Sequence, residues 1–394
     1  MNKVIKDYTC KMCLEEGLNE FDLFLKLKRV TSDCKPFESG GRLFVCDNCG
    51  GVQKISDEKW LKEISSIYKH YDTFSLPGFT DQVIMDGISQ TLQPRCNTLV
   101  KYLKNYLDLD DDLTWLDFGC GRGAMLNAAS KICKNLYGLD LDNSHEKYLS
   151  EIENFKKLYT ISEKKKMGKF NVISMVHSLE HFVDPYIELT DAYNLLTDKG
   201  ILFIQVNDTR LNPFEILVAD HLTHFEPYTL SQMVKKVGYK VLSVTNDWVT
   251  KEISLVAVKT DQNLNIQQSE SKLTHNLEKI NNQVDWLNAL SRKGRQLAKE
   301  SKNFGIFGSA VASTWLAKEI GEQVLFFVDE DIDRIGGKHM NKPIRSPLDL
   351  TLKDTTYIGL IPVIANKIYD KLNHLDTNFQ ISPEYDNFIK KGLK

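Results

Sequence analysis

One segment near the middle of the chain constrains the fold more than any other. Residues 114–126 consist of an apolar strand-like run, a carboxylate at Asp117, three alternating glycines and the start of a helical pattern. Glycines such as Gly119 and Gly121 allow a backbone to approach a ligand closely and leave amides free at the following helix. The segment therefore predicts a strand–turn–helix unit with a ligand at the turn.

The acidic residues around this turn indicate which ligand it binds. Dinucleotide-binding proteins use a similar glycine turn, but a carboxylate at Asp117 would repel a pyrophosphate and attract the ammonium of a methionine group. A second apolar run, 136–140, ends at Asp140, where a carboxylate can accept both hydroxyls of a ribose. Asp142 takes that role if the strand ends two residues later. We predict that Asp117, Gly119, Gly121 and Asp140 bind S-adenosylmethionine (SAM).

Strand-like and helical patterns alternate through the rest of the central region, which predicts an α/β domain with a parallel sheet. The expected strands are 114–117, 136–140, 171–175, 201–206 and 253–258. The polar stretch 263–301 has apolar residues at three- and four-residue steps, which predicts an amphipathic connecting helix. Strand-like runs at 303–307, 323–329 and 356–361 predict a second, smaller Rossmann-like domain. The predicted limits are 1–65, 66–262 and 263–394.

Two cysteine pairs mark the N-terminal region, which also contains a strand-like run at 42–45. Cys10 and Cys13 form one Cys-x-x-Cys pair, and Cys46 and Cys49 form another. Zinc binds four tetrahedral thiolates in such paired turns, and four protein ligands leave no open position for water. We predict a structural zinc site in a zinc-ribbon-like module. The alternatives are unrelated buried cysteines or, less suitably for two pairs, a redox site.

Composition limits the protein's class and partners. The chain has 394 residues, and its 50 Lys and Arg against 53 Asp and Glu give a net charge of −3. This balance provides no basic surface for nucleic acid. No apolar run has the length of a membrane span or of a secretory signal peptide. We therefore expect a cytoplasmic protein with reduced cysteines and a small-molecule substrate.

Histidines follow two of the predicted strands, at the sheet edge where α/β proteins bind ligands. His177 is expected near the methionine part of the cofactor. Glu180 and His181 are candidates for catalysis, or for packing and positioning.

The loop after the strand 201–206 contains the strongest candidate for a base. Methyl transfer from a sulfonium needs an aligned nucleophile, deprotonated where it is a hydroxyl or an acidic C–H. We predict His221 as the base with Asp220 orienting it, and His224 as an alternative. A capping Asp and a packed His would give the same pattern. Lys251 and Glu252 either contact the acceptor or lie in a solvated hairpin.

The order of these regions resembles one family over nearly the whole chain. The resemblance is to sugar C-methyltransferases that act on nucleotide-linked deoxysugars, and to related enzymes of bacterial surface-polysaccharide clusters. The resemblance rests on the four paired cysteines, the segment 117–121, His177 with Glu180 and His181, the segment 220–225, and the segments 305–310, 327–331 and 343–344. It implies a zinc module, a class I SAM methyltransferase domain and a Rossmann-like C-terminal domain that closes the acceptor cleft.

The resemblance also implies a substrate and a mechanism. In that family a Tyr-x-Glu-His-Leu stretch carries a histidine proposed to form an enolate from a keto-sugar. This chain has Asp220 and His221 there, but Val218 replaces the tyrosine and 251–254 replaces a later glycine-rich stretch. A methyl group transferred to a nucleotide-linked sugar is thus the expected activity, with O-methylation of a glycan or other small molecule as the alternative.

Two functions of other kinds remain as alternatives. The chain could retain SAM without turnover and serve as an interaction protein assembled through the cysteine module. An RNA methyltransferase would suit a zinc module, but the neutral charge argues against it. Gly305, Gly308 and Asp329 carry only part of a dinucleotide-binding fingerprint.

Overall fold

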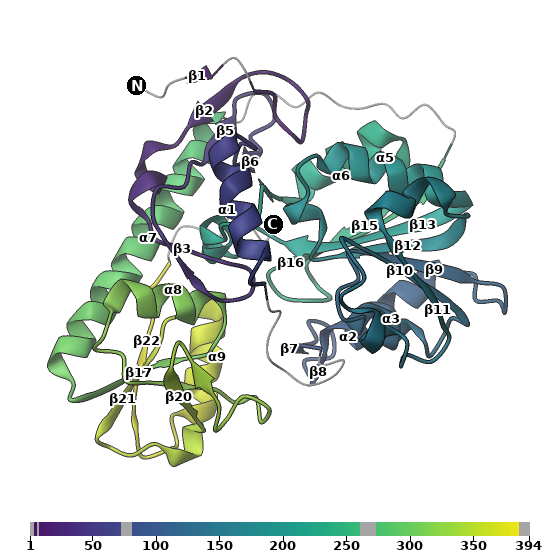
Figure 1. The fold of residues 1–394 in the computed structure, drawn as a ribbon. Coiled ribbons are helices and arrows are strands. Elements are labelled where there is room, and N and C mark those ends of the chain that lie inside the picture. Colours follow the sequence, from purple (N-terminus) through teal and green to yellow (C-terminus); the bar gives the residue numbers. More distant parts are fainter. Residues whose placement is uncertain (1–3, 6–7, 72–80, 261–272, 386–394) are drawn as a thin grey trace.

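The structure is a computed structural model that describes residues 4–5, 8–71, 81–260 and 273–385. It is a mixed α/β protein with a central sheet domain, an N-terminal module and a smaller C-terminal α/β domain (Figure 1). In the described residues, no helix combines the length and apolar character needed to cross a membrane.

The central domain contains a seven-stranded sheet in the order β11-β10-β9-β12-β13-β16-β15. Its strands are β9 (Thr114–Phe118), β10 (Asn135–Asp140), β11 (Phe155–Thr160), β12 (Phe170–Val176), β13 (Leu196–Asn207), β15 (Tyr239–Thr245) and β16 (Glu252–Lys259). All five strands expected in this region are present, four of them with bounds within one residue of the prediction, while β13 begins five residues before the predicted 201–206. Apolar side chains alternate between the two faces, so that Leu116 and Ile173 belong to one core and Trp115 and Val172 to the other.

The expectation of a parallel sheet is wrong for one strand, β16, which runs opposite to the others. β16 pairs antiparallel with both β13 and β15. β15 ends at Thr245 and β16 begins at Glu252, and a connection this short can join only antiparallel neighbours. β11 and β15 were not expected because both lie at sheet edges, where exposed polar residues interrupt the apolar pattern.

Helices cover both faces of this sheet (Figure 1). They are α2 (Arg95–Leu103), α3 (Ala124–Ala129), α4 (Glu146–Leu149), α5 (Pro185–Leu195) and α6 (Pro227–Val237). The Asp184 side chain caps α5 by accepting from the Ile187 amide, and Pro185 occupies the first turn, where its missing N–H costs nothing. A hairpin, β7 (Val83–Met85) and β8 (Leu92–Pro94), precedes α2.

The strand order changes direction between β9 and β12. From β9 the chain moves outward through β10 to β11, then returns to β12 on the other side of β9. In open α/β sheets the crevice at such a switch point, at the carboxyl ends of the strands, is where ligands bind. The glycine turn after β9 and His177 after β12 both lie at this edge.

The N-terminal module is built on a small sheet that includes a strand from the central domain. The strand order is β1 (Val4–Ile5), β2 (Leu18–Glu20), β5 (Phe44–Cys46), β6 (Val52–Gln53) and β14 (Thr223–His224). β5 overlaps the strand expected at 42–45. A hairpin of β3 (Arg29–Val30) and β4 (Pro36–Phe37), a 3₁₀ helix (Asp22–Lys26) and α1 (Glu58–Tyr68) complete it, and α1 extends beyond the predicted limit at residue 65.

A long helix, α7 (Leu273–Glu300), extends from the N-terminal module to the C-terminal domain (Figure 1). It confirms the connecting helix over its described length, because Ile280, Val284, Leu287 and Leu290 are all buried. The remainder of the predicted helix, 263–272, lies outside the described residues.

The C-terminal domain has a six-stranded sheet in the order β19-β20-β18-β17-β21-β22. Its elements are β17 (Asn303–Phe307), β18 (Phe326–Val328), β19 (Lys338–His339), β20 (Lys342–Arg345), β21 (Asp354–Ile358), β22 (Asn378–Ile381), α8 (Val311–Ile320) and α9 (Pro362–Leu372). The three strands expected here are present. β18 is shorter than predicted and β21 begins and ends earlier.

Candidate functional site

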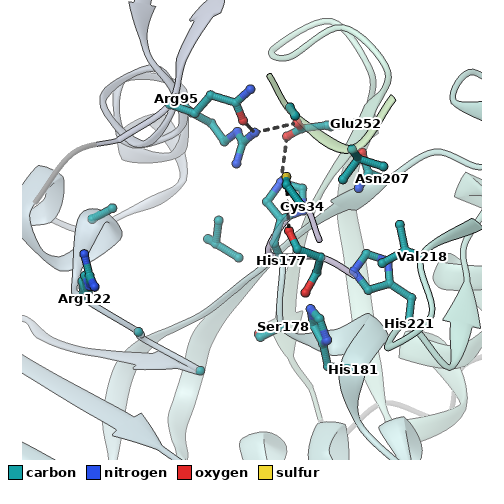
Figure 2. Close-up of a pocket in the computed structure, with 18 of the residues that line it drawn as sticks. Cys34, Arg95, Arg122, His177, Ser178, His181, Asn207, Val218, His221 and Glu252 are labelled. Atoms are coloured by element: carbon teal, nitrogen blue, oxygen red, sulfur yellow. Dashed lines mark hydrogen bonds and ion pairs between the residues drawn. The ribbon is translucent and has the colours of Figure 1, made fainter. Parts of the chain in front are cut away.

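A cavity of about 1290 Å³ opens at the switch point of the central sheet. All three parts of the chain contribute to its walls: Ser32, Tyr68 and Tyr71 from the N-terminal module, the strand ends of the central sheet, and Arg334 and Ile364 from the C-terminal domain. Figure 2 shows Arg122 on one side of this cavity and His181 and His221 on the other.

The glycine turn after β9 forms one wall. Gly119 has a φ of +80°, and a Cβ atom there would lie 2.6 Å from the Ser178 Cβ atom. Its amide donates to the Leu139 carbonyl at 2.8 Å, which holds the turn against β10. Gly121 has a φ of +49° with open space where its Cβ atom would be. The turn thus requires glycine conformations at both positions, but only Gly119 is sterically confined.

Asp140 closes the end of β10 beside this turn. One carboxylate oxygen, Oδ2, accepts from the Gly121 amide at 2.7 Å, and Oδ1 accepts from the Leu141 amide at 2.7 Å. Asp142, the alternative, also lines the cavity, and the Ser144 hydroxyl and amide hold its pKa below the usual range. The structure therefore brings Gly119, Gly121 and Asp140 together, and their binding of SAM stays a prediction.

Asp117 lies behind this wall and does not line the cavity. It is 3% exposed, and its Oδ1 atom accepts from the Ser174 hydroxyl at 2.6 Å. Burial raises the pKa of Asp117 to about 7, and the Ser174 hydrogen bond acts in the opposite direction. A direct contact of Asp117 with the cofactor ammonium stays a prediction, since the side chain is turned toward β12.

His177 follows β12 with a φ of +51°, a conformation uncommon for residues other than glycine. Its Nδ1 atom lies 3.3 Å from Glu180 Oε1, and its Nε2 atom lies 3.1 Å from Glu252 Oε2. Burial disfavours the imidazolium, but the Glu252 and Glu180 carboxylates outweigh it and raise the pKa of His177 to about 9. Glu252 also pairs with Arg95 at 3.3 Å, so His177 belongs to a charged network on the cavity wall (Figure 2).

His221 is oriented by a different carboxylate from the one expected. Its Nδ1 atom lies 2.5 Å from Glu215 Oε1, and Glu215 comes from a 3₁₀ helix, Pro213–Leu217. Burial disfavours the charged imidazole, but the Glu215 carboxylate outweighs it and raises the pKa of His221. His221 lines the cavity, so a histidine–carboxylate pair does face it.

Asp220 is directed away from His221, which corrects the expected Asp220–His221 pair. Its carboxylate accepts from the Ser32 amide at 2.8 Å and from the Ser32 hydroxyl, and lies 3.4 Å from His181 Nδ1. Asp220 therefore binds Ser32 and His181, while the carboxylate that binds His221 is Glu215. The His181 ring lies 4.5 Å from the His221 ring, and burial together with the His221 charge lowers the pKa of His181.

His224, the alternative base, is 1% exposed and does not line the cavity. Its Nε2 atom lies 3.0 Å from the Lys54 ammonium, and burial with this positive neighbour lowers the pKa of His224 to about 3. Lys54 also donates to the Val218 and His221 carbonyls at 2.6 and 2.7 Å. Lys54, a buried residue of the N-terminal module, therefore stabilises the loop that contains His221.

Several residues of the cavity were missed from the sequence. Glu215 lies six residues before His221, and Arg95 is far from its partner Glu252 in the chain. Among the missed residues, only the apolar Leu141 and Ile161 could have been predicted to line the cavity, because each directly follows a strand at the ligand-binding edge. Both side chains line the cavity and are exposed, Leu141 by 59% and Ile161 by 41%.

The four paired cysteines converge on one point in the N-terminal module. The ligand atoms of Cys10, Cys13, Cys46 and Cys49 all lie within 4.8 Å of one another. The Sγ atoms of Cys10 and Cys49, and those of Cys13 and Cys46, are 3.6 Å apart. Four thiolates bound tetrahedrally to zinc lie about 3.8 Å from one another, given bonds of about 2.3 Å. The cluster therefore fits a four-thiolate metal site.

Part of the chain is similar to known proteins. Residues 90–244 match a family model described as a methyltransferase domain. Among solved structures, a SAM-dependent methyltransferase from Aquifex aeolicus is similar with 17% identity and a TM-score of 0.36, covering 42% of this chain and 93% of that chain. A complex of the Haloferax volcanii Trm112 methyltransferase activator with a methyltransferase is similar with 14% identity and a TM-score of 0.36, covering 42% and 90%. No curated protein matches the sequence.

The family match, the strand order and the glycine turn together define the class. The central domain has the Rossmann-like fold of class I SAM methyltransferases, and the protein is a methyltransferase enzyme.

Proposed function

We propose that this enzyme transfers the methyl group of SAM to a carbon atom of a nucleotide-linked keto-sugar, with His221 as the base. The observation that carries the proposal is one cavity with the cofactor turn on one side and the His221–Glu215 pair on the other. Its volume, about 1290 Å³, exceeds the upper end of about 1000 Å³ usual for one small ligand. There is room for SAM and an acceptor together.

The cofactor residues have distinct roles in this proposal. Gly119 and Gly121 allow the methionine part to lie against the backbone, and the Asp140 carboxylate accepts the ribose hydroxyls. Leu141 and Ile161 offer apolar side chains for the adenine ring. His177, held by Glu180 and Glu252, borders the methionine end.

The chemistry assigned to the acceptor side is proton abstraction followed by in-line transfer. The Nε2 atom of His221 takes a proton from the carbon next to a carbonyl, and Glu215 stabilises the imidazolium that forms. The enolate carbon then attacks the methyl group, a C–C bond forms, the S–CH₃ bond breaks, and S-adenosylhomocysteine leaves. The C-terminal domain borders the same cavity through Arg334 and Ile364, where the nucleotide part would bind.

The experiment that tests this function is transfer of isotope-labelled methyl from SAM to a panel of nucleotide sugars, with and without a keto group. We expect label only in keto-sugars. Transfer to sugar hydroxyls would favour the O-methyltransferase alternative, and transfer to RNA with no sugar labelled would refute the proposal.

We also propose zinc as the ion of the cysteine cluster, in a structural role. Four thiolates satisfy tetrahedral zinc and leave no position for water or substrate. The Met12 and Gly51 amides point at the Cys10 and Cys49 sulfurs at 3.4 and 3.3 Å, which stabilises thiolates. The ion would stabilise the N-terminal module. Lys54 belongs to this module and donates hydrogen bonds to the loop that contains His221.

The two glycines of the cofactor turn provide a matched pair of variants. We expect Gly119→Ala to weaken SAM binding about 100-fold or more, because its methyl group would meet the Ser178 side chain at 2.6 Å and force the turn to move. Gly121→Ala, with open space at its Cβ atom, should lose about tenfold or less. Calorimetric titration with SAM measures both. Equal losses would show that the turn is not confined as described.

The buried lysine of the N-terminal module gives a further prediction. Lys54→Met should lower the free energy of unfolding by about 2 kcal/mol or more, because the buried Val218 and His221 carbonyls lose their donor. Lys59→Met, which removes an exposed contact to the Gly40 carbonyl, is the control and should change little. Urea unfolding measures both, and equal effects would contradict the role given to Lys54.

A further inference from the structure

Lys251 contributes a basic side chain to the cavity wall. Lys251 immediately precedes β16, lines the cavity and has a φ of +68°. A positive φ is uncommon for lysine and is kept only where surrounding structure fixes it. Here the Lys251 carbonyl accepts from the Asp208 amide at 2.9 Å, which ties the start of β16 to the end of β13.

The Lys251 amine has no hydrogen bond or ion pair among the residues that the structure describes. The two carboxylates whose charges act on it are Glu252 and Glu215, and both already bind other side chains. Glu252 binds Arg95, His177 and Gln205, the last at 2.8 Å. Glu215 binds His221. The Glu215 Oε2 atom has no hydrogen-bond partner in the described part of the chain, but neither carboxylate forms an ion pair with the Lys251 amine. A cation on a cavity wall without an ion pair of its own is suited to a ligand that brings a negative charge.

Burial works against the ammonium form of this amine. Burial lowers the pKa of Lys251, the Glu252 charge opposes this effect, and the Arg95 charge adds to it. An anionic oxygen beside the amine would favour the ammonium form and offset the cost of its burial.

The neighbours of Lys251 place it on the side of the cavity where the base lies. Asn207 pairs with Glu252 at the junction of β13 and β16. Figure 2 shows Asn207 and Glu252 on the same side of the cavity as His221, with Arg122 across from them. The charge of Glu215, the carboxylate that binds His221, also acts on the Lys251 amine, which assigns Lys251 to the His221 side of the cavity.

We infer that the Lys251 ammonium binds the acceptor's carbonyl oxygen and stabilises the negative charge that develops on it. This role rests on the proposed function. When His221 Nε2 takes the proton from the neighbouring carbon, the C–H electrons move into the C–C–O system and the oxygen becomes an enolate. The ammonium pairs with that oxygen, and the charge is consumed when the carbon attacks the methyl group. No further reactant is required.

The test follows proton exchange without methyl transfer. A thymidine-diphosphate-linked 4-keto-6-deoxyhexose is incubated in D₂O with enzyme and S-adenosylhomocysteine, and NMR follows deuterium entering the carbon beside the carbonyl. We expect Lys251→Met to slow exchange about 100-fold, as loss of one preorganised oxyanion donor does. Lys251→Arg should recover part of the rate. Lys240→Met, which changes an exposed lysine of β15, should behave as wild type.

Four outcomes would overturn the inference. Exchange by Lys251→Met at the wild-type rate leaves the proposed function standing but removes the role of Lys251. Loss of SAM binding in Lys251→Met, measured by calorimetry, would show a structural role instead. Covalent capture of the probe on Lys251 by cyanoborohydride would replace charge pairing with imine chemistry. Absence of exchange in the wild type, with methyl transfer to another acceptor, would refute the keto-sugar function and this role with it.

Discussion

Replacing His221 with asparagine should reduce methyl transfer about 1000-fold while SAM affinity stays unchanged. General-base catalysis typically contributes about 100- to 10,000-fold, and asparagine keeps a polar amide near the position of Nδ1 but cannot take up a proton. His221 lies on the acceptor side of the cavity, apart from the cofactor turn, so SAM binding should not depend on it. Steady-state rates with labelled SAM and calorimetric titration measure the two effects separately.

A histidine outside the cavity provides the control. His374→Asn changes an exposed residue of the C-terminal domain and should keep the wild-type rate. If His221→Asn also keeps that rate, His221 is not the base. The neighbouring His181 would then be the next candidate, since it lines the same cavity and its pKa is lowered.

The pH dependence of kcat/KM is a second test of the His221–Glu215 pair. Only the neutral imidazole can act as a base, so kcat/KM should fall as the pH drops through the pKa of His221. The Glu215 carboxylate raises this pKa, so the midpoint should lie above about 6.5, the value of a free imidazole. Glu215→Gln removes the negative charge and should move the midpoint to lower pH. A midpoint that stays in place would contradict the pairing.

The second large effect is expected from the cysteine cluster. Cys46→Ser should release the metal and unfold the N-terminal module, because binding of a structural zinc supplies about 10–16 kcal/mol in small zinc domains. Activity should be lost as well, since β6 pairs with β14 and Lys54 holds the His221 carbonyl. Elemental analysis of the purified protein and thermal unfolding measure the two consequences.

A buried cysteine outside the cluster is the matched control. Cys133 donates to the Leu113 carbonyl at 3.1 Å, a hydrogen bond that serine can also make, so Cys133→Ser should retain the metal and the unfolding midpoint. A wild-type protein without stoichiometric zinc would contradict the metal assignment. A Cys46→Ser protein as stable as Cys133→Ser would show that the cluster does not need an ion.

Local patterns predicted much of the fold correctly. The strand at β9, its glycine turn and the acid that ends β10 are recognisable because each lies in a short segment with one strong pattern. The cysteine pairs were recognisable for the same reason, and the four sulfur atoms converge as their spacing suggested. The edge strands β11 and β15 were missed because solvent-facing residues dilute their apolar pattern.

Local sequence patterns could not predict the contacts between segments that are distant in the chain. The sequence places Asp220 next to His221, but the partner of His221 is Glu215 on a 3₁₀ helix, while Asp220 binds Ser32 of the N-terminal module. Lys54 is separated from the loop it fastens by more than 160 residues. These pairings depend on how the module packs against the central domain, and neither spacing nor periodicity carries that information.

The most direct test of the account is the position of the transferred methyl group. The enzyme is incubated with SAM carrying a ¹³C methyl group and a thymidine-diphosphate-linked 4-keto-6-deoxyhexose labelled with ¹³C in the sugar ring, and the product is examined by NMR. The account predicts a one-bond ¹³C–¹³C coupling between the new methyl group and a ring carbon next to the carbonyl. A methyl group bound to oxygen, or no methylated sugar at all, would contradict it.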